Sequence, residues 1–346
     1  MTPADVSVII CTHSDARWQY LGQAVRSVQG QDLVPREIIV VVDHNPALRD
    51  RIQREFPNVR AVENREPRGA SGAKNTGVAV AVGKFVAFLD DDAVADPDWL
   101  ERLMQGLNRA EVLGVGGMTK PLWPDRRPRW FPREFDWVVG CTHRGTPGTG
   151  APVRNLIACN MIVRREVFEA FGGFRDGIGP NAGRALGCEE TEFCIRVNQR
   201  SPRKIWLQQL EAKVYHQVPA TRTTWRYFMR RCYGEGISKA LIADLVGTRA
   251  GLASERQYVA RTLPLGVLRG MSDLLLRFDL GGLGRATAIV LGLTATTFGY
   301  VKGRLLSANL ANPANVFGTR PPQKTAGSWI RFAASLTTNK HARKRS

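Results

Sequence analysis

The chain has 346 residues, 43% of them hydrophobic, and its 49 Lys and Arg against 31 Asp and Glu give a net charge of +18. This composition is typical of a packed globular protein and excludes a disordered chain, a collagen-like repeat and a small disulfide scaffold. Six cysteines form no CxxC pair and five histidines no HxxxH pair, which argues against a zinc or disulfide framework and favours a reducing, cytosolic compartment.

The N-terminal part of the chain alternates between two hydrophobic patterns. Short apolar, β-branched runs predict buried strands over 6–10, 37–42, 60–63 and 84–89. Helical spacing or small residues predict helices over 16–30, 50–56 and 71–82. This alternation predicts an α/β fold built on a Rossmann-like, mostly parallel sheet with helices on both faces. The apolar run at 6–11 is too short for the core of an export signal.

Polar side chains follow three of these strands, at 12–14, 43–45 and 90–92. Ligands of such sheets bind beyond the carboxyl ends of the strands, so these side chains are candidates for one binding site. The alternative is ordinary turn chemistry, because Asp, Asn and Ser also start turns and cap helices. Three polar strand ends at one sheet edge favour a binding site.

The segment 119–154 is rich in Pro, Trp, Arg and Gly and predicts a long irregular insertion over the site. Its large aromatic residues are Trp123, Trp130, Phe131 and Trp137. These side chains could stack on a ligand, or could pack onto their own domain. The next expected elements are a strand at 155–164, a helical turn at 166–171 and an acid-rich helix start at 187–197.

Beyond a strand-like segment that ends at His216, the pattern becomes helical. Amphipathic helices are predicted over 225–246 and 256–277, the second interrupted at Pro264. The uncharged stretch 286–301 is shorter than the ~20 residues of a membrane span, and so it predicts a buried or interfacial helix. Basic residues flank this stretch, so the extension at 221–310 is either a surface for an anionic membrane or ordinary helical core.

The end of the chain is strongly basic. From 301 to 346 it has nine Lys or Arg and no Asp or Glu, so half of the net charge lies there. We therefore expect an appended basic tail over 311–346 and no basic groove through the fold. Nucleic acid, anionic lipid and phosphorylated substrates are the partners that such charge can attract. The sequence has no recognised nucleic-acid-binding module, so we expect no specific nucleic acid partner.

The run Asp90-Asp91-Asp92 is the strongest local signal. Adjacent carboxylates repel by ~1 kcal/mol per close pair even in water, and a divalent cation offsets that repulsion. Carboxylate oxygens suit Mg²⁺ or Mn²⁺, which proteins often hold together with a substrate diphosphate. In an extended backbone Asp90 and Asp92 share one side, so we expect both to face one cation. The alternative is an acid-rich loop. Neither a Walker A loop nor a GxGxxG motif occurs after these strands.

Five stretches of the chain resemble inverting glycosyltransferases of family 2, which have the GT-A fold. They read SVIICTHSDARW (7–18), EIIVVVDHN (37–45), GASGAKNTGVAVAVGKFVAFLDDD (69–92), NMIVRREVFEAFGGF (160–174) and GCEETEFCIR (187–196). The stretch 214–240 also resembles a branch of this family that acts on lipid-linked sugars. The resemblance covers residues 6 to about 218. It implies a GT-A domain over 1–220, with a nucleotide-sugar half at about 1–118 and an acceptor half at about 119–220.

The resemblance also implies roles for single residues. Those expected to line the nucleotide-sugar pocket are Thr12, Asp43, Lys74, Asn75, Asp90 and Asp91. Those expected to hold Mn²⁺ or Mg²⁺ are Asp92, Asp90 and His216, although a lone His is more often structural. Asp43 would accept from a ring N–H of the base, which favours a UDP-sugar. The sequence after Asp43 departs from the family pattern, so the choice between uridine and guanosine stays open.

The acid pair Glu189-Glu190 would supply the general base, with Glu190 at a position where the family usually has Asp. The alternative is an acidic first turn stabilised by the helix dipole. The implied reaction moves a sugar from a nucleoside diphosphate to a hydroxyl of a saccharide or polyprenyl-linked acceptor. We expect the protein in the cytoplasm, peripherally on the inner face of the membrane.

The sequence leaves three alternative functions to consider: nucleic-acid binding, a non-catalytic membrane scaffold and nucleotidyl transfer. A non-catalytic protein on the same fold could bind membrane or nucleic acid through the basic charge. Intact acids at 90–92 and at Glu190 argue against a catalytically dead scaffold. A nucleotidyltransferase would share the architecture and the metal, but it normally needs a Gly-rich basic loop after the first strand, where this chain reads CTHSDARW.

Overall fold

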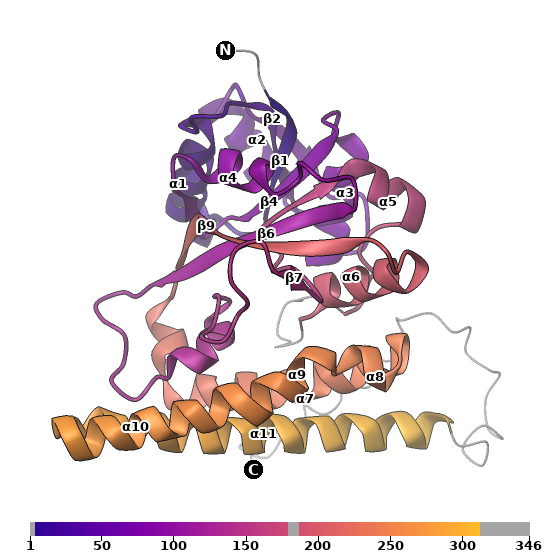
Figure 1. Ribbon diagram of the computed structural model, residues 1–346. Helices are drawn as coiled ribbons and strands as arrows, with labels where there is room; N and C mark the ends of the chain where they lie inside the picture. Colours follow the sequence, from indigo (N-terminus) through magenta and orange to yellow (C-terminus); the bar gives the residue numbers. More distant parts are fainter. Residues whose placement is uncertain (1–3, 179–186, 312–346) are drawn as a thin grey trace, which may run out of the picture.

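The computed structural model describes residues 4–178 and 187–311. They form an α/β domain with a layer of long helices beneath it (Figure 1). The basic tail expected at 311–346 lies outside the described residues, apart from Ala311 at the end of the last helix.

One sheet organises the α/β domain. Within the described ranges it has nine strands in the order β3-β2-β1-β4-β8-β6-β9-β5, and β7 pairs with β9. The strands are β1 (Ala4–Thr12), β2 (Pro35–Val42), β3 (Arg60–Glu63), β4 (Phe85–Asp90), β5 (Ala93–Ala95), β6 (Val112–Leu122), β7 (Pro152–Val153), β8 (Asn160–Arg164) and β9 (Ile205–Gln217).

The N-terminal half of the sheet is parallel. Strand β1 pairs in parallel with β2 and β4, and β2 pairs in parallel with β3. The connecting helices are α1 (Trp18–Gln29), α2 (Pro46–Glu55) and α3 (Ala70–Val80). In this register Thr12 lies beside Val42, and Cys11 lies beside Asp90. The carboxyl ends of β1, β2 and β4 therefore meet at one edge of the sheet. The α/β fold expected from the sequence is confirmed.

The other half of the sheet is mixed. Strand β8 runs antiparallel to β4 and β6, β6 and β9 are parallel to each other, and β5 is antiparallel to β9. The helices of this half are α4 (Trp99–Gln105), α5 (Arg165–Phe171) and α6 (Glu189–Arg200). Because β5 directly follows the acidic run and pairs Ala93 with His216, it brings the end of β9 to that run.

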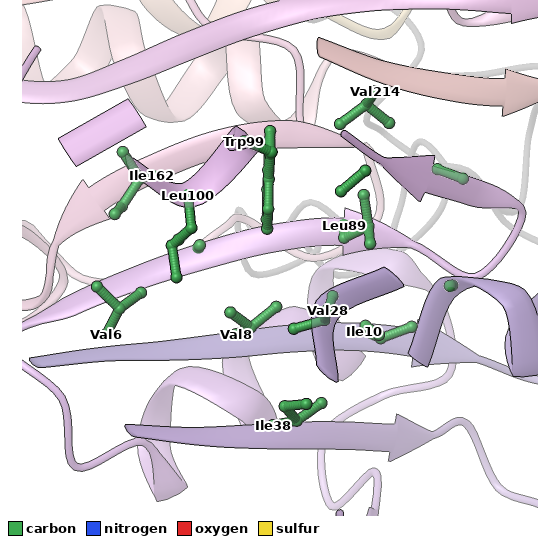
Figure 2. Close-up of a cluster of buried hydrophobic side chains, with 14 of the residues drawn as sticks. Val6, Val8, Ile10, Val28, Ile38, Leu89, Trp99, Leu100, Ile162 and Val214 are labelled. Carbon is green, nitrogen blue, oxygen red and sulfur yellow. The ribbon is translucent and has the colours of Figure 1, made fainter. Parts of the chain in front are cut away.

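Apolar side chains cover both faces of the sheet. On one face Val8 and Ile10 of β1 pack in one cluster with α1 and α4, and Figure 2 shows part of it around Trp99. On the other face Ile9 packs with Ala73 of α3 and with residues of α5 and α6. Alternate residues of β1 thus serve two cores, which explains why the strand reads as a continuous apolar run.

The helical layer consists of α7 (Trp225–Val246), α8 (Thr248–Gly251), α9 (Ala253–Gln257), a π-helical turn (Tyr258–Thr262), α10 (Leu263–Arg277) and α11 (Leu280–Ala311). Helices α10 and α11 run side by side along the side of the molecule away from the sheet (Figure 1). None of the helices within the described residues combines the length and the hydrophobicity needed to cross a membrane.

The insertion at 119–154 packs its aromatic side chains on the helical layer and not on the binding site. Phe131 and Phe135 are fully buried in one cluster with Phe228 of α7 and Ile289 of α11. The partly buried Trp123, Trp130 and Trp137 pack against the same cluster. Of the two roles left open for these aromatic residues, the structure therefore supports packing onto their own protein.

Some element boundaries differ from the sequence prediction. Helix α2 begins at Pro46 and not near 50, because the Asn45 side chain caps it by accepting from the Leu48 N–H at 3.1 Å. The interruption predicted at Pro264 is present, because a π-helical turn ends at Thr262 and α10 begins one residue before the proline. The proline lies in the first turn of α10, where a missing N–H costs no helical bond.

The closest approach of α7 to α11 yields a first prediction. A Cβ at Gly236 would overlap the carbonyl oxygen of Thr296, so Gly236→Ala should push the two helices apart. We expect a loss of about 1–3 kcal/mol in the free energy of unfolding, although Ala alone favours a helix over Gly by about 1 kcal/mol. Urea denaturation measures this.

The matched control is Gly22→Ala in helix α1, where the nearest group is the flexible end of Arg26. That variant should be neutral or stabilised. If both variants unfold at the same urea concentration, the tight α7–α11 contact does not limit stability.

Candidate functional site

The acidic run meets the end of β1 in a closed set of contacts. Thr12 Oγ1 donates to Asp91 Oδ2 at 2.7 Å, and Arg17 Nη1 donates to Asp91 Oδ1 at 2.5 Å. The same Arg17 nitrogen lies 3.2 Å from Asp92 Oδ2. Each oxygen of Asp91 thus accepts one hydrogen bond from the protein, which fixes the orientation of this carboxylate.

A second group of side chains gathers beside this run. Asp90, Asp92 and His216 each offer one ligand atom, and these atoms lie within 4.8 Å of one another. His216 Nε2 lies 3.2 Å from Asp92 Oδ1 and 4.0 Å from Asp90 Oδ2. His216 Nδ1 is buried and has no hydrogen-bond partner among the described residues. The structure thus brings together the three residues expected to hold a metal.

The electrostatics of the group fit a divalent cation. Burial and the neighbouring charge of Asp92 raise the pKa of Asp90, because it is unfavourable for both carboxylates to be ionised at this short distance. At Asp92, burial is outweighed by the hydrogen bond and charge of His216 and by Arg17, so the pKa of Asp92 lies well below its ordinary value. Two oxygen ligands and one imidazole nitrogen with such surroundings suit Mn²⁺ or Mg²⁺.

Asp43 organises the loop that leads into α3. Its Oδ1 accepts from Asn64 Nδ2 at 2.7 Å and lies 2.9 Å from His44 Nδ1, and its Oδ2 accepts from the Gly69 N–H at 3.0 Å. His44 adopts a positive φ of 54°, which places its ring against this carboxylate. Asp43 lies beside the site at the end of β2, as expected, and already has several protein partners.

Lys74 and Glu189 form a buried ion pair between the two halves of the site. Lys74 Nζ donates to Glu189 Oε1 at 2.6 Å, and both side chains are almost fully buried. Burial lowers the pKa of Lys74, but the charges of Glu189, Asp90 and Glu190 outweigh it, so the net shift is upward. Lys74 therefore stays charged and interacts with the acidic run and with the acid pair at once.

Glu190 has the electrostatic surroundings of a general base. Burial and the like charge of Glu189 raise the pKa of Glu190 to about 8, although Lys74 lowers it in part. Both acids lie in the first turn of α6, where the helix dipole favours negative charge. A carboxyl group that titrates near neutral pH can accept a proton and release it again.

Asn75 has protein partners at both ends of its side-chain amide. Its Nδ2 donates to the Phe174 carbonyl at 2.8 Å, and its Oδ1 accepts from the Phe174 N–H at 2.8 Å. A Cβ at Gly173 would overlap Asn75, which explains the glycine there. In this structure Asn75 joins α3 to the 172–174 turn, and both ends of its amide group are occupied.

Sequence reasoning missed two basic residues of the site. Arg17 contacts Asp91 and Asp92, and the charge of Arg222 helps to lower the pKa of Asp92. Arg17 could have been found as the first basic residue after the β1 end, on a short 3-10 turn capped by Ser14. Arg222 follows the β9 end by a similar distance, and the role expected for His216 near that end could have pointed to it.

Comparisons with known proteins agree on one family. The model of the family described as "Glycosyl transferase family 2" matches residues 7–172. A glucosyl-dolichyl phosphate glucuronosyltransferase of Haloferax volcanii is 32% identical over 314 residues, which cover 90% of this chain and 99% of the relative. The succinoglycan biosynthesis protein ExoM of Rhizobium meliloti is 24% identical over 240 residues, 67% of this chain and 72% of that protein.

Among solved structures, the mannosyltransferase PcManGT of Pyrobaculum calidifontis, in complex with GDP-Man and Mn²⁺, is 18% identical with a TM-score of 0.49. The match covers 97% of this chain and 81% of that one.

The raised pKa of Glu190 predicts how stability depends on pH. A carboxyl group whose pKa is higher in the folded state is neutral there while the unfolded chain already ionises. Wild type therefore loses stability between about pH 4.5 and pH 8. Glu190→Gln lacks this loss. We expect equal stability near pH 4.5 and an advantage of the variant that grows to a few kcal/mol at pH 8 and then stays constant.

Urea denaturation at several pH values measures the difference, and Glu166→Gln at an exposed position of α5 is the control. A difference between Glu190→Gln and wild type that does not change with pH would contradict the raised pKa.

Proposed function

Since the chain belongs to glycosyltransferase family 2 and is a glycosyltransferase, we propose that it transfers a sugar, with inversion, from a nucleoside diphosphate to a lipid-linked acceptor. The observation that carries this proposal is the position of Lys74. It is hydrogen-bonded to Glu189 and interacts with the charges of Asp90 and Glu190, so the acidic run and the acid pair belong to one site.

The donor would bind along the carboxyl ends of β1, β2 and β4. Thr12, Asp43, Lys74, Asn75, Asp90 and Asp91 are the proposed nucleotide-sugar residues. The side chain of Asp43 lies at the edge of this set and still has capacity to accept from the N–H of a uracil ring. We therefore favour a UDP-sugar. Arg17 and Lys74 provide positive charge for the diphosphate, and Asn75 would have to exchange its Phe174 contacts to reach a ligand.

Asp90, Asp92 and His216 are the proposed ligands of Mn²⁺ or Mg²⁺. When bound, such a cation neutralises negative charge that develops on a departing diphosphate. The short distances among the three side chains, with His216 Nε2 turned toward both carboxylates, support this assignment. Arg17 binds the carboxylate of Asp91, whereas Asp90 and the Oδ1 atom of Asp92 face the imidazole of His216.

Glu190 is the proposed catalytic base, and Glu189 is its electrostatic partner. The acceptor oxygen forms a bond to the anomeric carbon while the bond from that carbon to the diphosphate breaks, and the hydroxyl proton passes to the Glu190 carboxylate. Attack opposite the leaving group inverts the anomeric centre. The Lys74 pair fixes Glu189 and keeps a second negative charge next to Glu190, which raises the proton affinity of the base.

The proposed acceptor is a saccharide on a polyprenyl carrier. The name of the Haloferax volcanii relative, which specifies a glucosyl-dolichyl phosphate, supports this class, and the match extends over the helical layer as well. We propose that the enzyme works in the cytoplasm, on the inner face of the membrane, where such a carrier would present its sugar. The GT-A domain at 1–220 would carry the chemistry and the extension at 221–310 would serve the membrane.

Donor binding gives a direct prediction. A UDP-sugar with Mn²⁺ should raise the melting temperature, since about a hundredfold excess over the dissociation constant stabilises by about 2.7 kcal/mol. GDP- and dTDP-sugars should shift it less. Asp92→Asn should lose the part of the shift that depends on Mn²⁺. Asp125→Asn, at an exposed loop position, is the matched control.

A shift with the UDP-sugar that is equally large without metal, or that survives in Asp92→Asn, would contradict the metal assignment. A larger shift with a GDP-sugar would reverse the choice of base.

The acid pair gives a kinetic prediction. Glu190→Gln should lower kcat by about 10²-fold or more while the KM for the donor changes little, because a base acts only on the reacting proton. Glu189→Gln should keep activity and shift the rising limb of the pH–rate profile to lower pH, since it removes the like charge beside Glu190.

Steady-state transfer assays over pH 5–9 measure both effects. If Glu189→Gln is the inactive variant and Glu190→Gln retains activity, the two roles are exchanged.

A further inference from the structure

Helices α10 and α11 expose the side chains that a water-soluble helix buries. Leu276, Phe278 and Leu280, where the two helices join, are 77%, 87% and 76% exposed. The other exposed large apolar residues of the two helices are Leu265, Leu268, Leu275, Leu283, Val290, Leu291, Phe298, Val301 and Leu305. An apolar surface of this extent on one side of a protein indicates an interaction site.

The exposed residues form one stripe on each helix. On α11 they recur three, four or seven positions apart, except for the adjacent pair Val290 and Leu291, and this is the spacing of one helical face. The opposite face carries small residues. A Cβ at Gly282 would overlap α10, and one at Gly299 would overlap α7. In α10, Gly270 likewise faces α11, so both helices turn glycines toward the protein and large apolar side chains away from it.

The polar groups within the stripe of α11 are satisfied by the helix itself. Thr294 Oγ1 donates to the Val290 carbonyl at 2.9 Å, and Thr297 Oγ1 donates to the Leu293 carbonyl at 3.0 Å. A hydroxyl that already has a partner costs little to remove from water. These threonines therefore do not oppose transfer of the stripe into an apolar medium.

The charges along the two helices are mostly basic. Leu263–Ala311 contains five basic residues, at 269, 277, 285, 302 and 304, and two acids. Both acids pair with arginines, since Arg285 Nη2 lies 2.9 Å from Asp273 Oδ2 and 2.9 Å from Asp279 Oδ2. The nine basic residues of 301–346, two of which are in this set, add further positive charge from the sequence. The apolar stripes are thus accompanied by net positive charge.

We propose that the exposed stripes of α10 and α11 dock into the interfacial layer of an anionic lipid bilayer, with both helices in the membrane plane. Apolar side chains enter the headgroup boundary, and the basic residues meet lipid phosphates. A second copy of this chain is the other occupant to consider. It would bring two basic surfaces together, whereas anionic lipid complements them.

Helix α7 connects this surface with the active site. His216 near the end of β9 precedes α7 by a short 3-10 turn, and Cys188, directly before the acid pair, lies 3.7 Å from Glu235 of α7. Helix α7 packs against α11. A lipid-linked acceptor in the bilayer could therefore reach Glu190, and this step of the inference rests on the proposed function.

Vesicle flotation of the full chain tests the docking without donor or acceptor. Wild type should float with vesicles of equimolar phosphatidylcholine and phosphatidylglycerol, and less with phosphatidylcholine alone. Leu276→Glu combined with Phe298→Glu places one charge in each stripe and should lower the bound fraction at least about tenfold. Both side chains are exposed, so the melting temperature should not change.

The matched control is Val34→Glu combined with Val82→Glu, at exposed apolar positions of the α/β domain that are 45% and 51% exposed. It should float like wild type. Wild type that fails to float, or a stripe variant that floats as well as wild type, overturns the proposal.

Size-exclusion chromatography without lipid tests whether a second copy of the chain covers this surface instead. A wild type that elutes as a dimer and a stripe variant that elutes as a monomer would assign the surface to a second copy and overturn lipid docking. The failure of docking is distinct from a failure of the proposed function, because the thermal shift with a UDP-sugar and transfer to a short-chain, water-soluble acceptor do not need a membrane.

Discussion

Negative charge concentrated at the end of a buried strand is the constraint on which the rest of the site depends. Asp90 ends β4, Asp91 and Asp92 follow it directly, and two more carboxylates lie at the start of α6. Five acids in this space would repel one another strongly in a medium of low polarity. The fold places cations beside three of them, with Arg17 at Asp91 and Asp92 and Lys74 at Glu189. The arrangement leaves Asp90 and Glu190 least compensated, and their pKa values are raised; burial also raises the pKa of Asp91, although Arg17 lowers it in part.

The local parts of this arrangement could be predicted from the sequence. Strand runs such as 37–42 are apolar enough to be recognised, and polar residues directly after such runs fall at one sheet edge in any parallel sheet. That rule alone was enough to predict Thr12, Asp43 and Asp90 as site residues. The resemblance to family 2 then added Glu190, for which the residue pattern alone would have allowed a simple helix start.

The long-range parts could not be predicted in the same way. The Lys74–Glu189 pair joins residues 115 positions apart, and no local pattern shows that α3 and α6 meet there. His216 depends on the pairing of β5 with β9, and β5 is only three residues long. The aromatic residues of the insertion were ambiguous for a related reason. An aromatic side chain on a ligand and one in a core look alike in sequence, and only the contacts with α7 and α11 decide between them.

The same electrostatic arrangement also links catalysis to stability. Removing one partner of a buried ion pair typically costs about 3–5 kcal/mol, so Lys74 and Glu189 hold α3 against α6 as well as setting the charge beside Glu190. A base with a raised pKa is destabilising at neutral pH, because the folded chain must either keep a proton or bury a poorly compensated charge. The dense packing of the sheet core and of the glycine contacts between α7 and α11 offsets that cost at positions remote from the chemistry. The glycines of the helical layer also affect which side chains are exposed on its outer side. By turning its small residues inward it packs closely on the protein, and its large apolar side chains remain available on the outer side.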